Sequence, residues 1–382
     1  MSLWLTGLHI RLEKCAQLFV LISFIFCLGG CQSISDEQSR LNYFLVGSYT
    51  NEPDQGVYLV SYNESDDLLI NERVVVSATD PSYLNWQPTI NKLYSIGRGL
   101  DKKSVINVYD WKSNAFTKLK TYPIEGKGLC HINISDDRQQ LAVVNYTTGN
   151  SELFNINKAG LLVSRGQFTN TGSSITPRQR SAHLHFSGWD KQSRYLYLTD
   201  LGTDEIIVFD SLKSDFTPVH RIELTPGDGP RHLAFHPAKK LVFSLNELSN
   251  SISIFKILQN GALLHVSKTN IMPAKVGEQQ NLASAIRISE DGRHVYVAVR
   301  GENAIYGYQL MAETRLQLIN KVSSGGLHPR DFNFSKSQKQ LLVANQYSNN
   351  VVIIKRDLAS GKLFTTQSQL QIDAPSYVSY FN

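Results

Sequence analysis

The sequence predicts an all-β protein, a seven-bladed β-propeller with four-stranded blades that is closed by the C-terminal strand completing the first blade. Three observations predict this fold: a repeated order of short strands, a spacing of 46 to 55 residues between the copies, and a C-terminal segment that resembles the start of a later copy. With 382 residues, of which 42% are hydrophobic and 19% charged, the chain is long enough to bury a sizeable core in one large β domain.

Four segments show the repeat most clearly. Each begins with a short strand of alternating apolar and polar residues, passes through a polar turn, and reaches a second apolar strand that ends at a polar residue. A further turn and a third strand follow, and their β-branched and aromatic residues favour strands over helices. The four segments are Cys130–Asn145, Pro230–Asn246, Ser284–Arg300 and Pro329–Asn345.

The residue that ends the second strand gives the number of copies. This residue recurs at Gly47, Gly97, Asn145, Asp200, Asn246, Val299 and Asn345. The spacing fits propeller blades of four strands. Solenoids need a tighter and more uniform period, and the sequence has no helical periodicity long enough for the crossover helices of an α/β fold.

The two ends of the chain are expected to share a blade. Ala374–Val378 resembles Asp80–Leu84, which begins a later blade, whereas the first blade opens at Tyr43 without such an innermost strand. We therefore expect the last strand to complete the first blade, and loss of the last ten residues to destabilise the ring.

The N-terminus has the features of an export signal. Arg11 and Lys14 precede an apolar run from Leu18 to Leu28, which is followed by Gly29, Gly30 and Cys31. The string Leu28–Cys31 resembles a bacterial lipobox, which implies that Cys31 is acylated and becomes the first residue of the mature protein. The alternative is a single membrane-spanning helix, but the run is shorter than the roughly 17–25 residues that a span requires.

The sequence thus predicts three segments: a lipoprotein signal peptide over residues 1–31, a polar tether over 32–41, and the propeller over 42–382. Gln32 directly after Cys31 resembles an outer-membrane sorting signal. We therefore expect an extracytoplasmic protein with a lipid anchor in a bacterial membrane, facing the periplasm or held at the outer membrane. Of the four cysteines, the mature domain keeps Cys130, so no internal disulfide is expected.

The charge pattern narrows the classes of partner. The formal net charge of +5 is small for this length, and Lys and Arg are scattered among Asp and Glu, which gives no support for nucleic-acid binding. A mild positive balance suits a small anionic or sugar-derived ligand where Arg side chains converge. The sequence lacks nucleotide-binding glycine motifs, a HExxH motif and a Cys/His cluster, so we expect no cofactor and no metal.

Polar residues recur at strand ends that a propeller brings together around the mouth of its channel. Other propellers often carry Val, Ala or Ser at such positions, so this density favours a functional site. In or just before the first strands lie His131, His183, His185, Arg231, His232, Arg330 and Asp331. At or after the end of the second strands lie Asn145, Asp200, Asn246, Glu247, Arg300, Asn345 and Gln346.

Several strings carry a family resemblance. They are Gly229–His232, Asn246–Leu248, Val299–Gly301, His328–Phe332, Leu342–Gln346, and Arg178-Gln-x-x-Ala-His-x-His with Thr199–Gly202. Together they resemble the seven-bladed propeller lactonase family, which includes bacterial 6-phosphogluconolactonases and fungal carboxymuconate cyclases. The resemblance runs from Tyr43 to the C-terminus. It implies a catalytic group formed by His183, Arg231, Glu247 and Arg300.

Lactone hydrolysis needs a base that activates water, donors for the oxyanion and a proton for the ring oxygen. Glu247 is the expected base, His183 can act as base or acid near neutral pH, and Arg231 and Arg300 can bind a carboxylate or phosphate and stabilise developing negative charge. Val299 stands where the family usually has Asn, so one wall of the site is expected to be less polar. The predicted substrate-binding residues are His131, Asn145, His185, Asp200, Asn246, Arg330 and Gln346.

Structural roles remain open for several of these residues. His131, Asn145 or Asn345 can serve only to satisfy backbone groups in a blade, and Arg231 with Glu247 can form a purely structural ion pair. His183 and His185 can be two metal ligands, because strand alternation points both to one face, although no third ligand is evident.

The function that the sequence favours is hydrolysis of a sugar-acid lactone at the channel mouth. A lactonising isomerase or cyclase on the same scaffold is a related alternative, and a non-catalytic binding or scaffold propeller lipoprotein is a different one. Because 6-phosphogluconolactone forms in the cytoplasm, either an exported chain uses an unphosphorylated lactone or the signal has been misread.

Overall fold

The structure is a computed structural model that describes residues 41–381 except 51, 53, 100, 273, 274, 277, 278 and 313. The predicted signal peptide, Cys31 and the tether as far as residue 40 lie outside the described residues. The first strand begins at Leu41, one residue before the predicted start of the propeller.

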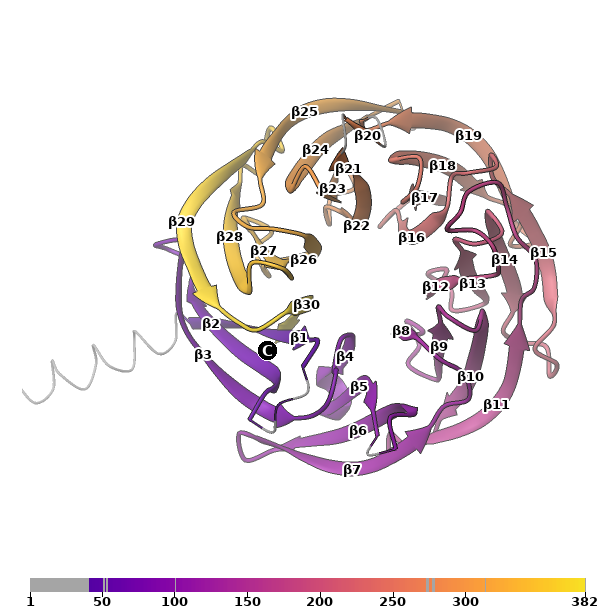
Figure 1. The fold of residues 1–382 in the computed structure, drawn as a ribbon, viewed down its shortest axis with the longest axis horizontal. Coiled ribbons are helices and arrows are strands. Elements are labelled where there is room, and N and C mark those ends of the chain that lie inside the picture. Colours follow the sequence, from indigo (N-terminus) through magenta and orange to yellow (C-terminus); the bar gives the residue numbers. More distant parts are fainter. Residues whose placement is uncertain are drawn as a thin grey trace, which may run out of the picture.

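Seven four-stranded antiparallel sheets surround a central axis, with the innermost strand of each sheet nearest to that axis (Figure 1). The prediction of a seven-bladed β-propeller with four-stranded blades is confirmed. Four of the predicted second-strand ends, Asn145, Asp200, Asn246 and Asn345, are the last residues of their strands. Alternating short strands separated by polar turns therefore form the blades as their sequence pattern predicts.

The strands of the first four blades follow one another along the chain, apart from the strand contributed by the C-terminus. Blade 1 contains β1 (Leu41–Ser48), β2 (Gly56–Asn63), β3 (Leu68–Ser77) and β30 (Pro375–Phe381). Blade 2 contains β4 (Leu84–Gln87), β5 (Lys92–Arg98), β6 (Ser104–Lys112) and β7 (Ala115–Pro123). Blade 3 contains β8 (Leu129–Ile134), β9 (Gln140–Asn145), β10 (Asn150–Ile156) and β11 (Leu162–Thr169). Blade 4 contains β12 (Leu184–Trp189), β13 (Tyr195–Asp200), β14 (Glu205–Asp210) and β15 (Pro218–Glu223).

The remaining three blades have the same order from the axis outward. Blade 5 contains β16 (Pro230–Phe235), β17 (Leu241–Asn246), β18 (Ser251–Ile257) and β19 (Leu263–Asn270). Blade 6 contains β22 (Leu282–Ile288), β23 (His294–Arg300), β24 (Ala304–Met311) and β25 (Arg315–Ser323). Blade 7 contains β26 (Pro329–Phe334), β27 (Gln340–Asn345), β28 (Asn350–Arg356) and β29 (Leu363–Gln371). A short 3-10 helix, η1 (Pro88–Ile90), follows β4, and a small hairpin of β20 (Lys275–Val276) and β21 (Gln279–Gln280) precedes blade 6.

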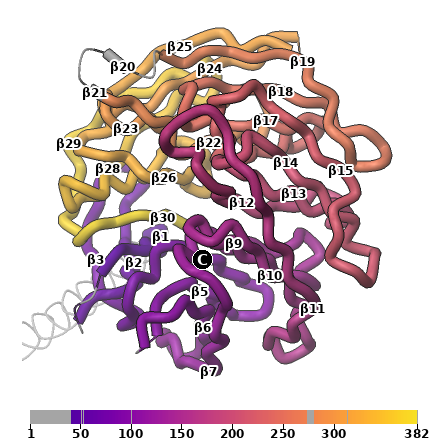
Figure 2. Tube along the Cα trace, turned by 45° about the vertical axis from the view of Figure 1, so that its right-hand side comes forward, coloured from indigo at the N-terminus to yellow at the C-terminus, as the bar shows by residue number. Residues whose placement is uncertain are grey.

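The predicted closure of the ring is also confirmed. Strand β30 pairs antiparallel with β1, with Tyr43 opposite Phe381 and Leu45 opposite Ser379, and it occupies the innermost position of blade 1. In Figure 2 the C-terminal strand lies beside the N-terminal one. The two ends of the described chain thus share one sheet, which removes the open seam between the last blade and the first.

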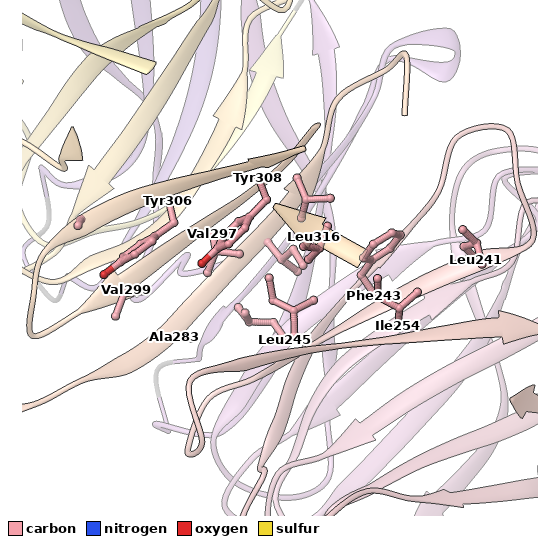
Figure 3. Close-up of a cluster of buried hydrophobic side chains, with 14 residues drawn as sticks. Leu241, Phe243, Leu245, Ile254, Ala283, Val297, Val299, Tyr306, Tyr308 and Leu316 are labelled. Carbon is pink, nitrogen blue, oxygen red and sulfur yellow. The ribbon is translucent and has the colours of Figure 1, made fainter. Parts of the chain in front are cut away.

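Apolar side chains fill the spaces between neighbouring blades. Between blades 5 and 6, Phe243 and Leu245 of β17 pack with Val297 of β23 and Tyr306 of β24, and all four are buried (Figure 3). Each blade uses both faces of its sheet in this way, which explains the apolar runs in the middle strands. Within the described residues, no helix has the length and apolar character needed to cross a membrane.

Candidate active site

A cavity of about 1340 Å³ is lined by residues at one end of the strands. Its walls come from all parts of the ring, because residues far apart in the sequence reach this end of their blades. Among the predicted site residues, the cavity is lined by His185, Arg231, Glu247, Arg300, Arg330 and Gln346. The structure thus brings together six residues that span more than 160 positions of the chain (Gln346 − His185 = 161).

A β-bulge in the innermost strands points side chains into this cavity. In β16, Pro230 pairs with Asn246 and His232 pairs with Leu245, so that Arg231 is the extra residue between them. The same register shift recurs in six blades, and the extra residues are Cys130, His185, Arg231, Ser284, Arg330 and Ser376. A bulge interrupts the alternation of a strand and so changes where a side chain points. Four of these residues, Cys130, His185, Arg231 and Arg330, line the cavity, whereas the Ser284 and Ser376 hydroxyls donate to backbone carbonyls.

A second row of cavity residues directly follows the second strand of a blade. Tyr146, Glu247 and Gln346 come after the predicted strand-end residues Asn145, Asn246 and Asn345. In blade 6 the equivalent cavity residue is Arg300, which ends β23.

The strand-end residues themselves turn back into their blades. Asn145 donates to the Glu125 carbonyl at 3.0 Å, and Asn345 donates to the Ser324 carbonyl at 3.0 Å, so both side chains tie down the loop that leads into their own blade. Asn246 is fully buried and donates to Ser251 and Ser253 at 2.9 and 3.0 Å.

Asp200 is fully buried as well. Its carboxylate accepts backbone N–H groups of His183 and Gly202 at 2.7 and 2.8 Å and the side chain of Asn170 at 2.7 Å. Asn145, Asp200 and Asn246 were predicted to bind substrate. None of the three lines the cavity, and the hydrogen bonds above hold their side chains within the blades, although Oδ1 of Asn145 makes no hydrogen bond within the described protein.

Glu247 is the centre of an ion cluster in the cavity. Its Oε1 lies 2.6 Å from Nη1 of Arg178, and its Oε2 lies 2.8 Å from both Nε of Arg231 and Nη2 of Arg300. The side chains of Glu247, Arg231 and Arg300 are 2%, 3% and 9% exposed, whereas Arg178 is 37% exposed toward the solvent. One buried carboxylate therefore orients three guanidinium groups.

The protonation state of this cluster follows from its charges. Burial raises the pKa of Glu247, but the cations of Arg300, Arg231 and Arg178 outweigh burial and hold the pKa well below the ordinary range of a carboxyl group. Burial and the cation of Arg300 lower the pKa of Arg231 to about 10, so it is charged at neutral pH. Glu247 is consequently an anion whose lone pairs are already bound, which makes it a poor proton acceptor.

Arg330 lies at the edge of this cluster and is held by neutral groups. It donates to Oε1 of Gln346 at 3.3 Å and to the hydroxyl of Tyr49 at 2.9 Å, and its guanidinium stacks over the Tyr49 ring. Its positive charge adds to those of the three arginines around Glu247. The cavity therefore carries a surplus of cationic donors suited to a carboxylate or an oxyanion.

The two candidate histidines of blade 4 have different surroundings. His185 is the bulge residue of β12 and lines the cavity, whereas His183 precedes the strand and is absent from the cavity lining. The His183 ring stacks on Tyr146 with ring centroids 4.4 Å apart, and its Nδ1 lies 2.8 Å from the Tyr146 carbonyl oxygen. The bulge at His185 breaks the alternation on which a shared face was predicted, but both rings contact Tyr146, with the His185 and Tyr146 centroids 5.7 Å apart.

His185 is neutral at physiological pH. Burial lowers its pKa well below the ordinary value of an imidazole, and the cation of Arg231 lowers it further. Its Nδ1 is buried and makes no hydrogen bond within the described protein. A neutral imidazole beside three guanidinium groups can accept a proton from a polarised water.

His131 lies in the channel lining next to aromatic rings rather than in the cavity. Its ring is 4.3 Å from Tyr83 and 5.6 Å from His232, and Nδ1 lies 3.3 Å from the Ser187 hydroxyl. His131 is 2% exposed. The predicted contact between His131 and substrate is not supported by this position.

Among the cavity residues that sequence reasoning missed, Tyr49, Tyr146 and Arg178 contact predicted site residues. Arg178 begins the string Arg178-Gln-x-x-Ala-His-x-His, and Tyr146 follows Asn145 as Glu247 follows Asn246, so both carried a signal. Across the described part of the chain, no group of three or more His, Cys, Asp or Glu has an arrangement that fits a metal ion.

Comparisons with known proteins agree with this architecture. The family described as lactonase, 7-bladed beta-propeller matches residues 43–380. A 6-phosphogluconolactonase of Formosa agariphila is 33% identical over 353 residues, covering 88% of this chain and 98% of its own, and one of Bacillus subtilis is 28% identical over 342 residues, covering 88% and 97%. The structure of a periplasmic gluconolactonase of Pseudomonas aeruginosa superimposes with a TM-score of 0.83 at 26% identity, covering 90% of this chain and 99% of that one.

The family match spans nearly the whole described ring, and the relatives match along almost their full length. These are the proteins that the sequence motifs resemble, and the fold that the motifs imply is the one observed. The chain therefore belongs to the lactonase family of seven-bladed β-propellers.

Proposed function

We propose that this protein hydrolyses a sugar-acid lactone in the cavity at the channel mouth. The observation that carries the proposal is the buried Glu247 carboxylate with the guanidinium groups of Arg178, Arg231 and Arg300 around it, next to the neutral His185. A scaffold protein has no need to converge three arginines on one buried carboxylate. Lactone hydrolysis does need cationic donors, because its transition state and its product are both anionic.

In the proposed mechanism, His185 accepts a proton from a water that attacks the lactone carbonyl. Arg231 and Arg300 stabilise the negative charge that forms on the carbonyl oxygen, because their guanidinium groups are already oriented. The bond between the carbonyl carbon and the ring oxygen then breaks, and the ring oxygen takes up the proton. The product is an open-chain hydroxy acid whose carboxylate is attracted by the arginines.

This assignment of roles differs from the one that the sequence favours. Glu247 orients the arginines instead of acting as base, because three guanidinium groups occupy its oxygens. His185 replaces His183 as the catalytic histidine, because it is the one that lines the cavity. Arg330 and Gln346 retain their predicted role of binding the substrate.

The test is hydrolysis of gluconolactone and of its 6-phosphate by purified protein, with spontaneous ring opening subtracted. We expect the wild type to accelerate ring opening of at least one of them, and Arg231→Gln to lose roughly 100-fold or more in kcat/KM. A wild-type rate equal to the buffer rate on both lactones contradicts the proposal.

We further propose that the protein is exported and held by a lipid on Cys31. The relative from Pseudomonas aeruginosa is described as a periplasmic gluconolactonase, which supports an unphosphorylated substrate outside the cytoplasm. Labelling of cells with a fatty-acid probe should mark the wild-type protein and not Cys31→Ser. Label retained by that variant contradicts the anchor.

A further inference from the structure

The blades contribute unequally to the lining of the cavity. Blades 4 to 7 contribute residues close to the axis, whereas blades 2 and 3 contribute whole loops. We call this extension the outer arm. It is lined by Arg98 and Asp101–Ser104 from the turn after β5, by Pro123–Leu129 between β7 and β8, and by Thr147 and Thr148 after β9.

The outer arm crosses the full width of a blade. Pro123 ends β7, the outermost strand of blade 2, and the connection that follows it leads to β8, the innermost strand of blade 3. Because neighbouring strands lie about 4.8 Å apart, three such spacings make the arm roughly 14 Å long. A cavity of about 1340 Å³ also exceeds the roughly 300–1,000 Å³ that usually suffice for a small ligand. A single hexose lactone at the arginines leaves the arm unfilled.

The walls of the arm are fixed by hydrogen bonds. The Lys127 N–H donates to the Thr148 hydroxyl at 3.0 Å, and the Thr147 N–H donates to the Lys127 carbonyl at 3.1 Å. Asn145 and Asn150 both donate to the Glu125 carbonyl, at 3.0 and 2.8 Å. The arm is therefore shaped before any ligand binds, which reduces the entropy cost of binding.

Blade 7 has the same loop with larger side chains. The Gln346 N–H donates to the His328 carbonyl at 3.1 Å, as the Tyr146 N–H donates to the Gly128 carbonyl at 2.8 Å, so Gly128 corresponds to His328 and Thr147 to Tyr347. Both loop residues have a left-handed backbone, with φ of +75° at Gly128 and +63° at His328. The His328 and Tyr347 rings stack with centroids 3.8 Å apart.

Blade 3 thus has a glycine and a threonine where blade 7 has a stacked aromatic pair. Gly128 and Thr147 line the outer arm, whereas neither His328 nor Tyr347 lines the cavity. Its lining includes many polar groups of both charge signs: Thr147 and Thr148 carry hydroxyls, Lys102 and Lys127 are exposed cations, and Asp101 and Glu125 are exposed anions. Hydroxyl, ammonium and backbone groups are matched by a polyhydroxylated ligand and not by an apolar chain.

We infer that the outer arm binds a saccharide attached to the lactone ring, so that the preferred substrate is the lactone of an aldonic acid at the end of a disaccharide or longer sugar. This inference rests on the proposed function, and it adds a specificity site to it. The chemistry is unchanged: water adds across the lactone carbonyl, the ring C–O bond breaks, and the glycosidic bond to the extension stays intact.

The test compares kcat/KM for cellobionolactone and gluconolactone. We expect the wild type to prefer the disaccharide lactone by at least tenfold. Thr147→Tyr, which copies the blade 7 residue into the arm, should lower kcat/KM for cellobionolactone to the gluconolactone level and leave gluconolactone hydrolysis within twofold. The matched control is Tyr347→Thr in blade 7, which should leave the preference unchanged.

The outcomes separate the two proposals. If the protein hydrolyses gluconolactone and its kcat/KM for the disaccharide lactone is equal or lower, the outer arm is not a sugar site. The proposed lactonase activity still stands in that case. A preference for a long-chain acyl lactone overturns the sugar chemistry of the arm. No hydrolysis of any lactone overturns the proposed function itself. If Thr147→Tyr does not fold, the same two kcat/KM values are compared for Lys127→Ala, which removes an exposed cation of the arm. The control for this variant is Lys158→Ala, which removes an exposed cation elsewhere.

Discussion

Glu247 and the arginines around it depend on one another. A buried carboxylate without its cations is costly, and so are buried guanidinium groups without their anion. The arrangement costs desolvation energy in the resting protein. It provides donors whose positions are fixed before the substrate arrives, which is the condition for strong electrostatic stabilisation of an oxyanion.

We predict that Glu247→Gln lowers both stability and activity. Loss of the anion leaves buried Arg231 and Arg300 uncompensated, which should cost about 3–5 kcal/mol in the free energy of unfolding. Misplacement of the guanidinium groups should lower kcat/KM for gluconolactone by roughly 100-fold. Denaturant unfolding and a corrected rate assay measure the two effects.

The control for this prediction is Glu64→Gln, the same chemical change in a solvent-accessible ion pair with Lys339 at 4.0 Å, in which the Glu64 and Lys339 side chains are 23% and 57% exposed. Such surface pairs contribute about 1 kcal/mol or less, so stability and rate should hardly change. If Glu247→Gln behaves like Glu64→Gln, the carboxylate does not organise the arginines.

We also predict a pH profile without an acid limb near neutrality. A general base works when it is neutral, and burial lowers the pKa of His185 well below the ordinary imidazole value of about 6.5. Protonation that stops catalysis therefore sets in only at lower pH. The kcat/KM for gluconolactone, measured in a pH-stat, should stay level from about pH 8 to about pH 6.5.

The matched variants are His185→Asn and His183→Asn. Loss of the proposed base should cost roughly 100-fold or more in kcat, whereas loss of His183, which stacks on Tyr146, should cost less than tenfold. An acid limb near pH 6.5 in the wild type, or the reverse order of the two variants, assigns the base to another residue.

The residue scale is where the sequence alone predicted least. Arg231, Glu247 and Arg300 were predicted from strand ends and from a family resemblance, and they do converge. The choice between His183 and His185 was not predictable from strand alternation, because the bulge at His185 leaves no pattern of apolar and polar residues. A polar residue at a strand end can either hold the blade together or line the cavity. The sequence therefore does not distinguish Asn246, whose hydrogen bonds lie within its blade, from Glu247, which lines the cavity.

At the scale of elements, the strands were predictable because their pattern is local. Alternation and β-branched residues mark a strand wherever it lies, and the polar turns separate one strand from the next. The outermost strands were less evident, because both faces of β7 and β11 are largely exposed and carry mixed residues. The outer arm could not be predicted, since its walls come from three loops that have no regular pattern of apolar and polar residues.

Strand β30 is the element on which the closed ring depends. It pairs with β1, and Val378 lies in the apolar cluster between blades 7 and 1. We predict that truncation after Asp373 leaves β1 as an open edge and yields aggregated or protease-sensitive protein. Truncation of Asn382 alone is the control and should leave the melting temperature unchanged. Cooperative unfolding of the longer truncation at the wild-type temperature contradicts the role of β30.

At the scale of the whole molecule, the closed ring brings residues that are far apart in the sequence close together in space. Every blade contributes residues to the cavity, so the site requires all blades to hold their angular positions. The number of blades was predictable from the repeat, and the closure from the echo between Ala374–Val378 and Asp80–Leu84. The ring should then tolerate a change in where the chain begins, provided that blade 1 still receives β30.

We therefore predict that a circular permutant folds and remains active. Because Tyr43 lies opposite Phe381, a short Gly/Ser linker from residue 381 to Leu41 converts β30 and β1 into a hairpin. New termini at Leu212, which is 76% exposed in the turn between β14 and β15, cut no strand. The melting temperature should stay within roughly 5 °C of the wild type. A second permutant opened at the fully buried Ser244 in β17 is the control, and it should fail to fold. Equal loss of stability in both permutants would mean that the order of the blades along the chain, and not the closed ring, holds the molecule together.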